Sequence, residues 1–169
     1  DTIEVDYTLV QLLIKTIKDG NIDQIRNYID KYGLDVKIIK DTQLDQNCLF
    51  FCCLIKDDAV ALEAIKLFVD LGVEPFQKDK INQTCLYYAA REQKYECSKF
   101  LCERGVPLND KDIYGQTPLY YAAREGCTRI VELFISYFAD VNLEDKYGQI
   151  AAFYSTKNGH EETTEYLLK

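Results

Sequence analysis

Residues 112–126 read DIYGQTPLYYAAREG, and residues 79–93 read DKINQTCLYYAAREQ. Aligned without gaps, the two segments are identical at most positions, and Thr84 and Thr117 lie 33 residues apart. A third copy, DKYGQIAAFYSTKNG, starts at Asp145, 33 residues after Asp112. Self-similarity at a fixed period of about 20–50 residues is typical of repeat proteins, whose units bury their apolar faces only against their neighbours. The sequence therefore predicts a stack of like units.

Two weaker copies come earlier in the chain. One contains QNCLFFCC, residues 46–53, and places Asn47 37 residues before Thr84, which indicates four inserted residues within 56–61. The other, residues 9–37, keeps only the apolar pattern of two helices. We therefore expect one domain over residues 1–169, with a degenerate unit at about 6–41, a unit with the insertion at 42–78, and units at 79–111, 112–144 and 145–169.

Each unit carries signals for a turn followed by a helix. Thr117 and Pro118 form a typical helix start, because a threonine oxygen can accept from an unpaired backbone N–H and proline lacks the N–H that would be unpaired in the first turn. Thr84 and Asn47 are expected to cap in the same way. Two residues before each cap we expect a residue that tolerates positive φ, namely Asp45, Asn82, Gly115 and Gly148.

A 33-residue unit containing TPLYYAAREG, residues 117–126, resembles the ankyrin repeat. The resemblance is strong over residues 42–169 and weak over 1–41. It implies an all-α solenoid of about five helix–turn–helix units with short β-hairpin fingers. The sequence departs from the family signature at Gln93 and Phe138, where glycine is expected, and wherever an aromatic residue replaces the signature histidine. These aromatic residues are Phe50, Tyr87, Tyr120 and Phe153.

The last unit is more polar than the others. It carries Ser155, Thr156, Thr163 and Thr164 where small or branched apolar residues are usual. Two interpretations stay open: a terminal unit that caps the stack, or a chain that stops at Lys169 within a helix. Because the sequence begins at Asp1 and contains no methionine, we expect it to be a fragment of a larger protein.

Net charge, apolar runs and cysteine count limit the kinds of partner and the cellular compartment that we expect for this protein. The net charge of −8 disfavours nucleic acid, which is bound through lysine and arginine. No apolar run approaches the roughly 20 residues that span a bilayer, so membrane insertion is not expected. The seven cysteines are odd in number and mostly replace small apolar residues, which favours reduced, buried thiols and an intracellular protein, cytoplasmic or nuclear, over a secreted disulfide framework.

The sequence offers little that points to catalysis. The single histidine, His160, has no cysteine or serine partner in a recognisable motif. Glycine-rich phosphate-binding motifs are absent, and carboxylates are spread along the units rather than paired. Cys-x-x-Cys spacing is absent as well, which disfavours a zinc site. We therefore expect no enzyme activity, no metal and no cofactor in this segment.

The resemblance implies that finger tips and the exposed side of the first helices line a concave binding face. It places Ile81, Ile113, Tyr114 and Tyr147 at the tips, with Gln83, Gln116 and Gln149 beside them. The first helices contribute a cationic row, Arg91, Arg124 and Lys157. For the tip residues, packing against the next finger is the alternative to binding. Tyr87, Tyr88, Tyr120 and Tyr121 are expected to pack between units.

The predicted function is a non-catalytic, monomeric module that binds another protein or peptide on this face. Two alternatives stay open. One is a methyl-lysine reader of histone tails, although the chain has no tryptophan, the best residue for an aromatic cage. The other is a targeting or regulatory domain within a larger enzyme or channel.

Overall fold

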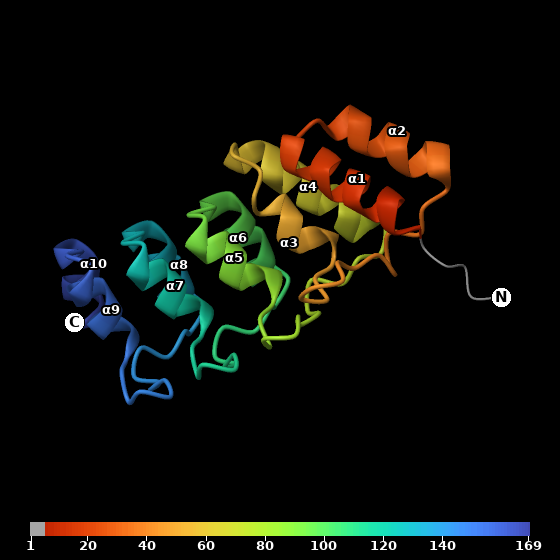
Figure 1. The fold of residues 1–169 in the computed structure, drawn as a ribbon. Coiled ribbons are helices and arrows are strands. Elements are labelled where there is room, and N and C mark those ends of the chain that lie inside the picture. The colour runs from red at the N-terminus through yellow and green to blue at the C-terminus, as the bar shows by residue number, and fades with distance from the viewer. Residues whose placement is uncertain (1–5) are drawn as a thin grey trace.

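The computed structural model describes residues 6–169, which form ten helices in five consecutive pairs. The pairs stack side by side from one end of the molecule to the other (Figure 1). Residues 6–169 contain no helix that is both long enough and apolar enough to cross a bilayer. The helices are α1 (Tyr7–Asp19), α2 (Ile22–Tyr32), α3 (Cys48–Cys52), α4 (Asp58–Asp70), α5 (Cys85–Arg91), α6 (Tyr95–Glu103), α7 (Pro118–Arg124), α8 (Thr128–Ser136), α9 (Ala151–Lys157) and α10 (Glu161–Leu167).

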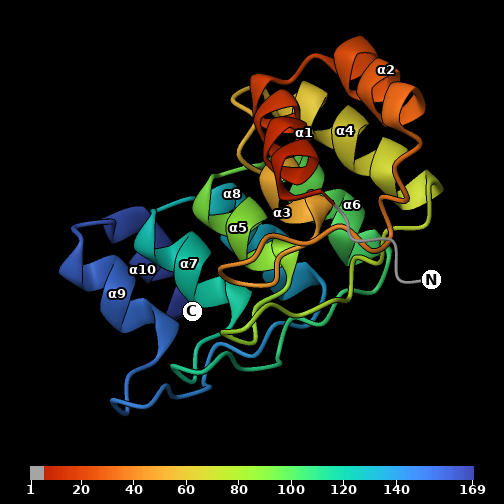
Figure 2. The same cartoon turned by 45° about the vertical axis from the view of Figure 1, so that its right-hand side comes forward.

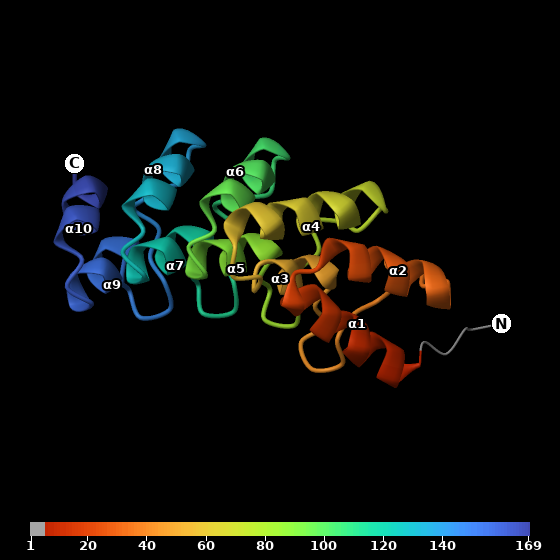
Figure 3. The ribbon, with the colours of Figure 1, turned by 90° about the horizontal axis from the view of Figure 1, so that it is seen from above.

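The helices lie in two rows. The odd-numbered helices form one row and the even-numbered helices the other (Figure 3). Within the first row, α7 packs against both α5 and α9. The loops that join successive pairs project as fingers on the side of the odd-numbered helices (Figures 1 and 2). The fingers and the first row therefore share one face of the molecule.

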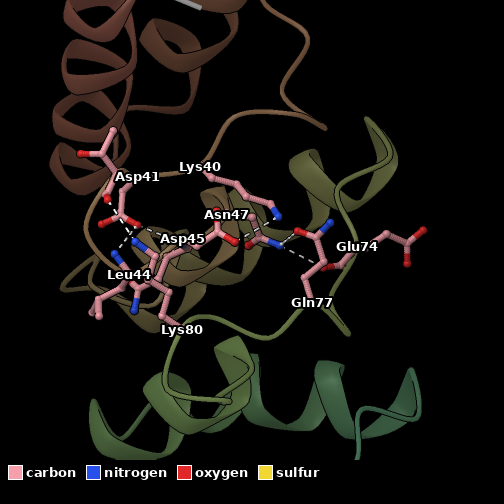
Figure 4. Close-up of polar contacts among 10 residues, drawn as sticks. Lys40, Asp41, Leu44, Asp45, Asn47, Glu74, Gln77 and Lys80 are labelled. Atoms are coloured by element: carbon pink, nitrogen blue, oxygen red, sulfur yellow. Dashed lines mark hydrogen bonds and ion pairs between the residues drawn. The ribbon is translucent and has the colours of Figure 1, made fainter.

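The fingers are hydrogen-bonded turns with very little strand. Within residues 6–169 a single antiparallel bridge is formed, between Lys40 and Asn47 of the first finger. Figure 4 shows this finger, where the Asn47 side chain donates to the Glu74 carbonyl and to Gln77 Oε1, both at 3.0 Å. Each finger is joined to the next by a backbone hydrogen bond. These bonds run from Lys80 N to Leu44 O (2.8 Å), from Ile113 N to Ile81 O (3.1 Å) and from Lys146 N to Tyr114 O (3.1 Å).

The predicted turns and caps are confirmed in part. Asp45, Asn82, Gly115 and Gly148 all have positive φ, between 59° and 74°. Asn47 caps α3 by accepting from Leu49 N at 3.0 Å. The side-chain caps expected of Thr84 and Thr117 are wrong, because both residues occupy the N-cap position without making the bond. Both residues are buried, and the Thr84 hydroxyl has no hydrogen-bond partner within residues 6–169.

The insertion lengthens α4 by about one turn. This helix has 13 residues, whereas α6 and α8 have nine each. Asp58 is the first residue of α4, and its carboxylate accepts from the backbone N–H groups of Glu96 (2.8 Å) and Cys97 (3.3 Å). One unit thus caps a helix of the next, and the carboxylate opposes the positive end of the α6 dipole.

The core runs continuously through the stack, and six cysteines are buried in it. Cys52 and Cys53 stand where the other units have Ala89 and Ala90, and all four side chains are fully buried. Burial raises the pKa of the Cys48 and Cys85 thiols to about 12, which keeps them protonated and unreactive. Cys127, at the start of α8, is half-buried.

Two residues adopt the left-handed conformation where glycine was expected. Gln93 has φ 56° and Phe138 has φ 69°. Phe138 is also 87% exposed, so it gains almost no burial in return for the strained backbone. At the equivalent position in the preceding unit, Gly105 has φ 80°.

Replacing Phe138 by glycine should therefore raise the free energy of unfolding by about 1 kcal/mol, because the steric cost of a side chain in the left-handed region is removed. Equilibrium urea unfolding followed by circular dichroism measures the change. The matched control, Gly105→Ala, introduces the same strain and should lower stability by a similar amount. A Phe138→Gly variant that is less stable than the parent would show that the exposed ring contributes to the fold.

Candidate protein-interaction surface

A buried aspartate organises each finger from the second onward. In the finger of residues 112–116, Asp112 Oδ1 accepts from Tyr114 N and Gln116 N, both at 2.9 Å, and so closes the turn. Its second oxygen accepts from Gln83 Nε2 of the preceding finger at 2.8 Å. One carboxylate thus fixes its own finger and joins it to its neighbour.

The same arrangement occurs three times, and a tyrosine of the first-row helix completes each one. We call these sets the finger network: Gln46–Asp79–Tyr88, Gln83–Asp112–Tyr121 and Gln116–Asp145–Tyr154. In the third set, Gln116 Nε2 donates to Asp145 Oδ2 at 3.0 Å, and the Tyr154 hydroxyl donates to the same oxygen. Burial alone would raise the pKa of Asp145, but the hydrogen bonds that it accepts outweigh burial and lower that pKa. The carboxylate therefore stays ionised at neutral pH.

The finger network corrects the predicted tip residues. Gln83 and Gln116 were expected on the exposed tips, but they are only 2% and 5% exposed. Each turns inward because its amide bonds the aspartate of the next finger. Gln149, the equivalent residue of the last finger, is half-buried, and its side chain makes no hydrogen bond within residues 6–169.

The tyrosines that stand in place of the signature histidine, Tyr87 and Tyr120, each direct a hydroxyl at two carbonyl oxygens of the following finger. The Tyr87 hydroxyl donates towards the carbonyls of Asp110 (2.7 Å) and Gln116 (3.0 Å) in the following finger. The Tyr120 hydroxyl lies in the same way against Leu143 O and Gln149 O. Burial raises the pKa of both phenols. These contacts confirm that the helix tyrosines pack between units.

The finger tips present an apolar and aromatic edge. Ile113 and Tyr114 are 42% and 43% exposed, and Tyr147 is 73% exposed, whereas Ile81 is half-buried. The backbone N–H groups of Tyr114 and Tyr147 are held by the finger aspartates at 2.9 Å. Their rings therefore extend from a fixed turn.

The three members of the predicted cationic row differ. Lys157 is exposed at the end of α9, but Arg91 and Arg124 are half-buried. The Arg91 guanidinium lies 4.3 Å from the Tyr88 ring centroid and pairs with Glu92 at 3.1 Å. The Arg124 guanidinium lies between the rings of Tyr121 (5.0 Å) and Tyr154 (4.9 Å). Stacking on tyrosine therefore fixes both arginines, which sequence spacing alone did not indicate.

The surface lacks the features of a metal centre. Residues 6–169 bring together no cluster of three or more histidine, cysteine, aspartate or glutamate side chains that could hold a metal ion. His160 is half-buried at the start of α10, and its ring lies against Gly126 of the preceding unit. The chemistry that the face offers is aromatic stacking and charged hydrogen bonding.

Comparison with known protein families agrees with this architecture. A family profile that describes three copies of the ankyrin repeat matches residues 6–112, 49–145 and 108–169. The chain belongs to the ankyrin-repeat family. Proteins of this kind generally act as protein-interaction modules. A search of curated proteins gave no match to the chain.

The finger network of this ankyrin-repeat chain can be tested at Gln116. Replacing Gln116 by alanine should lower the free energy of unfolding by about 1–3 kcal/mol, because the buried Asp145 carboxylate loses a hydrogen-bond donor. Gln149→Ala is the matched control, since the same residue type at the same position makes no side-chain bond. It should change stability by less than about 0.5 kcal/mol. Equal effects in the two urea titrations would contradict the assigned role of Gln116.

Proposed function

We propose that this ankyrin-repeat stack binds a protein or peptide on the face formed by its fingers and first-row helices. The observation that carries the proposal is the edge of exposed Tyr114 and Tyr147 rings, held on closed turns. Tyrosine and arginine are among the residues that most often dominate binding energy at interfaces. Exposed aromatic rings on turns contribute little to the fold, which favours a role in binding.

Preorganisation of the face supports the same proposal. The finger network and the finger-to-finger backbone bonds restrict the tips before any partner arrives. A surface that is already ordered loses less conformational entropy on binding, so more of the contact energy appears as affinity. We further propose that the module is monomeric, non-catalytic and intracellular, the last because a core with six buried thiols suits a reducing compartment.

The methyl-lysine reader is less well supported by the site. A cage for a methylated ammonium group needs aromatic faces that are free to surround it. Here Tyr121 and Tyr154 flank the Arg124 guanidinium, and Tyr88 is stacked by Arg91. The chain's own cations thus occupy the faces of these three tyrosines, and the exposed Tyr114 and Tyr147 rings would supply only part of a cage.

The proposal predicts separate effects on affinity and stability. Tyr114→Ala and Tyr147→Ala should each weaken the complex with a partner recovered by pull-down by about 1–3 kcal/mol, the usual range for interface anchors. Their melting temperatures should stay close to that of the parent, because exposed substitutions change stability by under about 0.5 kcal/mol. Isothermal titration calorimetry and thermal denaturation measure the two quantities.

Leu119→Ala provides the contrast. Leu119 is buried in α7, and its truncation should cost about 2–5 kcal/mol of stability through the cavity left behind. If Tyr114→Ala lowers the melting temperature as much as Leu119→Ala, the tip tyrosine is a packing residue. If neither tip variant changes affinity, the partner binds elsewhere and the proposed face is wrong.

A further inference from the structure

Two arginines in equivalent positions of neighbouring repeats have different partners. Arg91 ends α5 and Arg124 ends α7. Both guanidinium groups stack on the tyrosine three residues earlier, at 4.3 Å for Arg91 and 5.0 Å for Arg124. Arg91 also directs Nε and Nη2 at Glu92 Oε1, both at 3.1 Å. The first repeat of this pair therefore shows a carboxylate bound to a guanidinium that is stacked on tyrosine.

Arg124 is held more firmly but has no acidic partner. Although Glu125 follows it, no carboxylate of residues 6–169 lies within ion-pair distance of its guanidinium. The group lies between Tyr121 and Tyr154, and Nη2 donates to Gln116 Oε1 at 3.1 Å. The Gln116 amide is itself oriented, because its nitrogen donates to Asp145.

The remaining donors of Arg124 form a preorganised site for an anion. A guanidinium has five N–H donors in a planar fork that matches a carboxylate, and Gln116 uses only part of this set. Stacking from two sides fixes the plane of the fork, so binding does not have to order a mobile side chain. The Arg91–Glu92 pair shows that a guanidinium stacked on one tyrosine can bind a carboxylate.

The other charges on these elements are mixed. Lys111 and Lys146 lie on the flanking fingers, and Lys157 ends the next first-row helix. The same elements carry the exposed Asp110, Glu125 and Glu144 and the buried Asp112 and Asp145, so cations do not outnumber carboxylates there. The preference for an acidic ligand therefore rests on the Arg124 guanidinium itself, which has no acidic partner within residues 6–169.

We propose that Arg124, framed by Tyr121 and Tyr154, binds an aspartate or glutamate side chain of an acidic peptide that lies across the finger face. The inference rests on the proposed peptide-binding function and specifies its partner chemistry. Bound in this way, the carboxylate receives charge-assisted hydrogen bonds from a group that is already in position. Tyr114 and Tyr147 supply contact area on the adjoining fingers.

The test uses the chain of residues 1–169 and a library of short random peptides displayed on phage. Enriched peptides are synthesised with a fluorescent label and titrated by anisotropy. Each aspartate or glutamate is then changed in turn to asparagine or glutamine. One such change should weaken binding to the parent by about 10–100-fold, the loss expected for a hydrogen bond to a charged group. The same peptide change should alter the affinity for the Arg124→Gln variant by less than about threefold. The effects of two substitutions do not add when the two groups contact each other.

Further variants distinguish the planar hydrogen-bonding geometry of the Arg124 guanidinium from its positive charge. Arg124→Lys should bind much as Arg124→Gln does, because lysine keeps the charge but has no planar fork. Arg129→Gln is the matched control, since Arg129 stacks on Tyr95 at 4.1 Å but lies in the second row of helices. It should change affinity by less than about threefold. Changes made in the peptide alone leave the folding of the protein untouched.

The contradicting outcomes are distinct. Peptides that lose affinity on Tyr114→Ala or Tyr147→Ala, but carry no carboxylate coupled to Arg124, would overturn this inference and leave the proposed function standing. A library without enriched peptides, or with peptides insensitive to the tip variants, would contradict the proposed function itself. If phosphoserine in place of the critical carboxylate binds more tightly, the site takes a phosphate and the carboxylate assignment is wrong.

Discussion

The structure depends on a buried carboxylate at the start of each finger from the second onward. Asp112 closes its own turn with one oxygen and accepts an amide hydrogen bond from the preceding finger with the other. An ionised carboxylate is expensive to bury unless nearly all of its lone pairs are used. That cost makes the joined arrangement of fingers the stable one, because separating Gln83 from Asp112 would leave a buried charge with fewer donors. Local turn geometry and the stacking of repeats are thus set by the same group.

This coupling also builds the face on which binding is proposed. Gln116 is held by Asp145, and it in turn holds Arg124 between two tyrosines. The finger tips extend from turns closed by the same aspartates. Residues 33 positions apart are therefore brought side by side by polar contacts as well as by the apolar core. A linear peptide from one repeat would contain only a fraction of the surface.

The repeat period and its signature were enough to predict the helical stack, the positive-φ turns and the burial of the cysteines, because these depend on local backbone preference and apolar spacing. The directions of polar side chains were not predictable in the same way. Gln83 and Gln116 look like exposed tip residues until the next finger supplies an acceptor. Likewise, the insertion could be read from the sequence. The capping of α6 by Asp58 could not, because this hydrogen bond joins two different repeats. The joint recurrence of glutamine and aspartate at a period of 33 was the available signal.

Hydrogen–deuterium exchange of an Asp112→Ala variant tests most directly whether one carboxylate joins two fingers. The amides of Tyr114 and Gln116 lose their acceptor, so their exchange should accelerate by about tenfold or more, the factor that corresponds to roughly 1.4 kcal/mol. Exchange should also rise, to a smaller extent, in the preceding finger at Ile81 and Gln83, while α1 keeps its protection. Acceleration confined to residues 112–116 would contradict the coupling of neighbouring fingers.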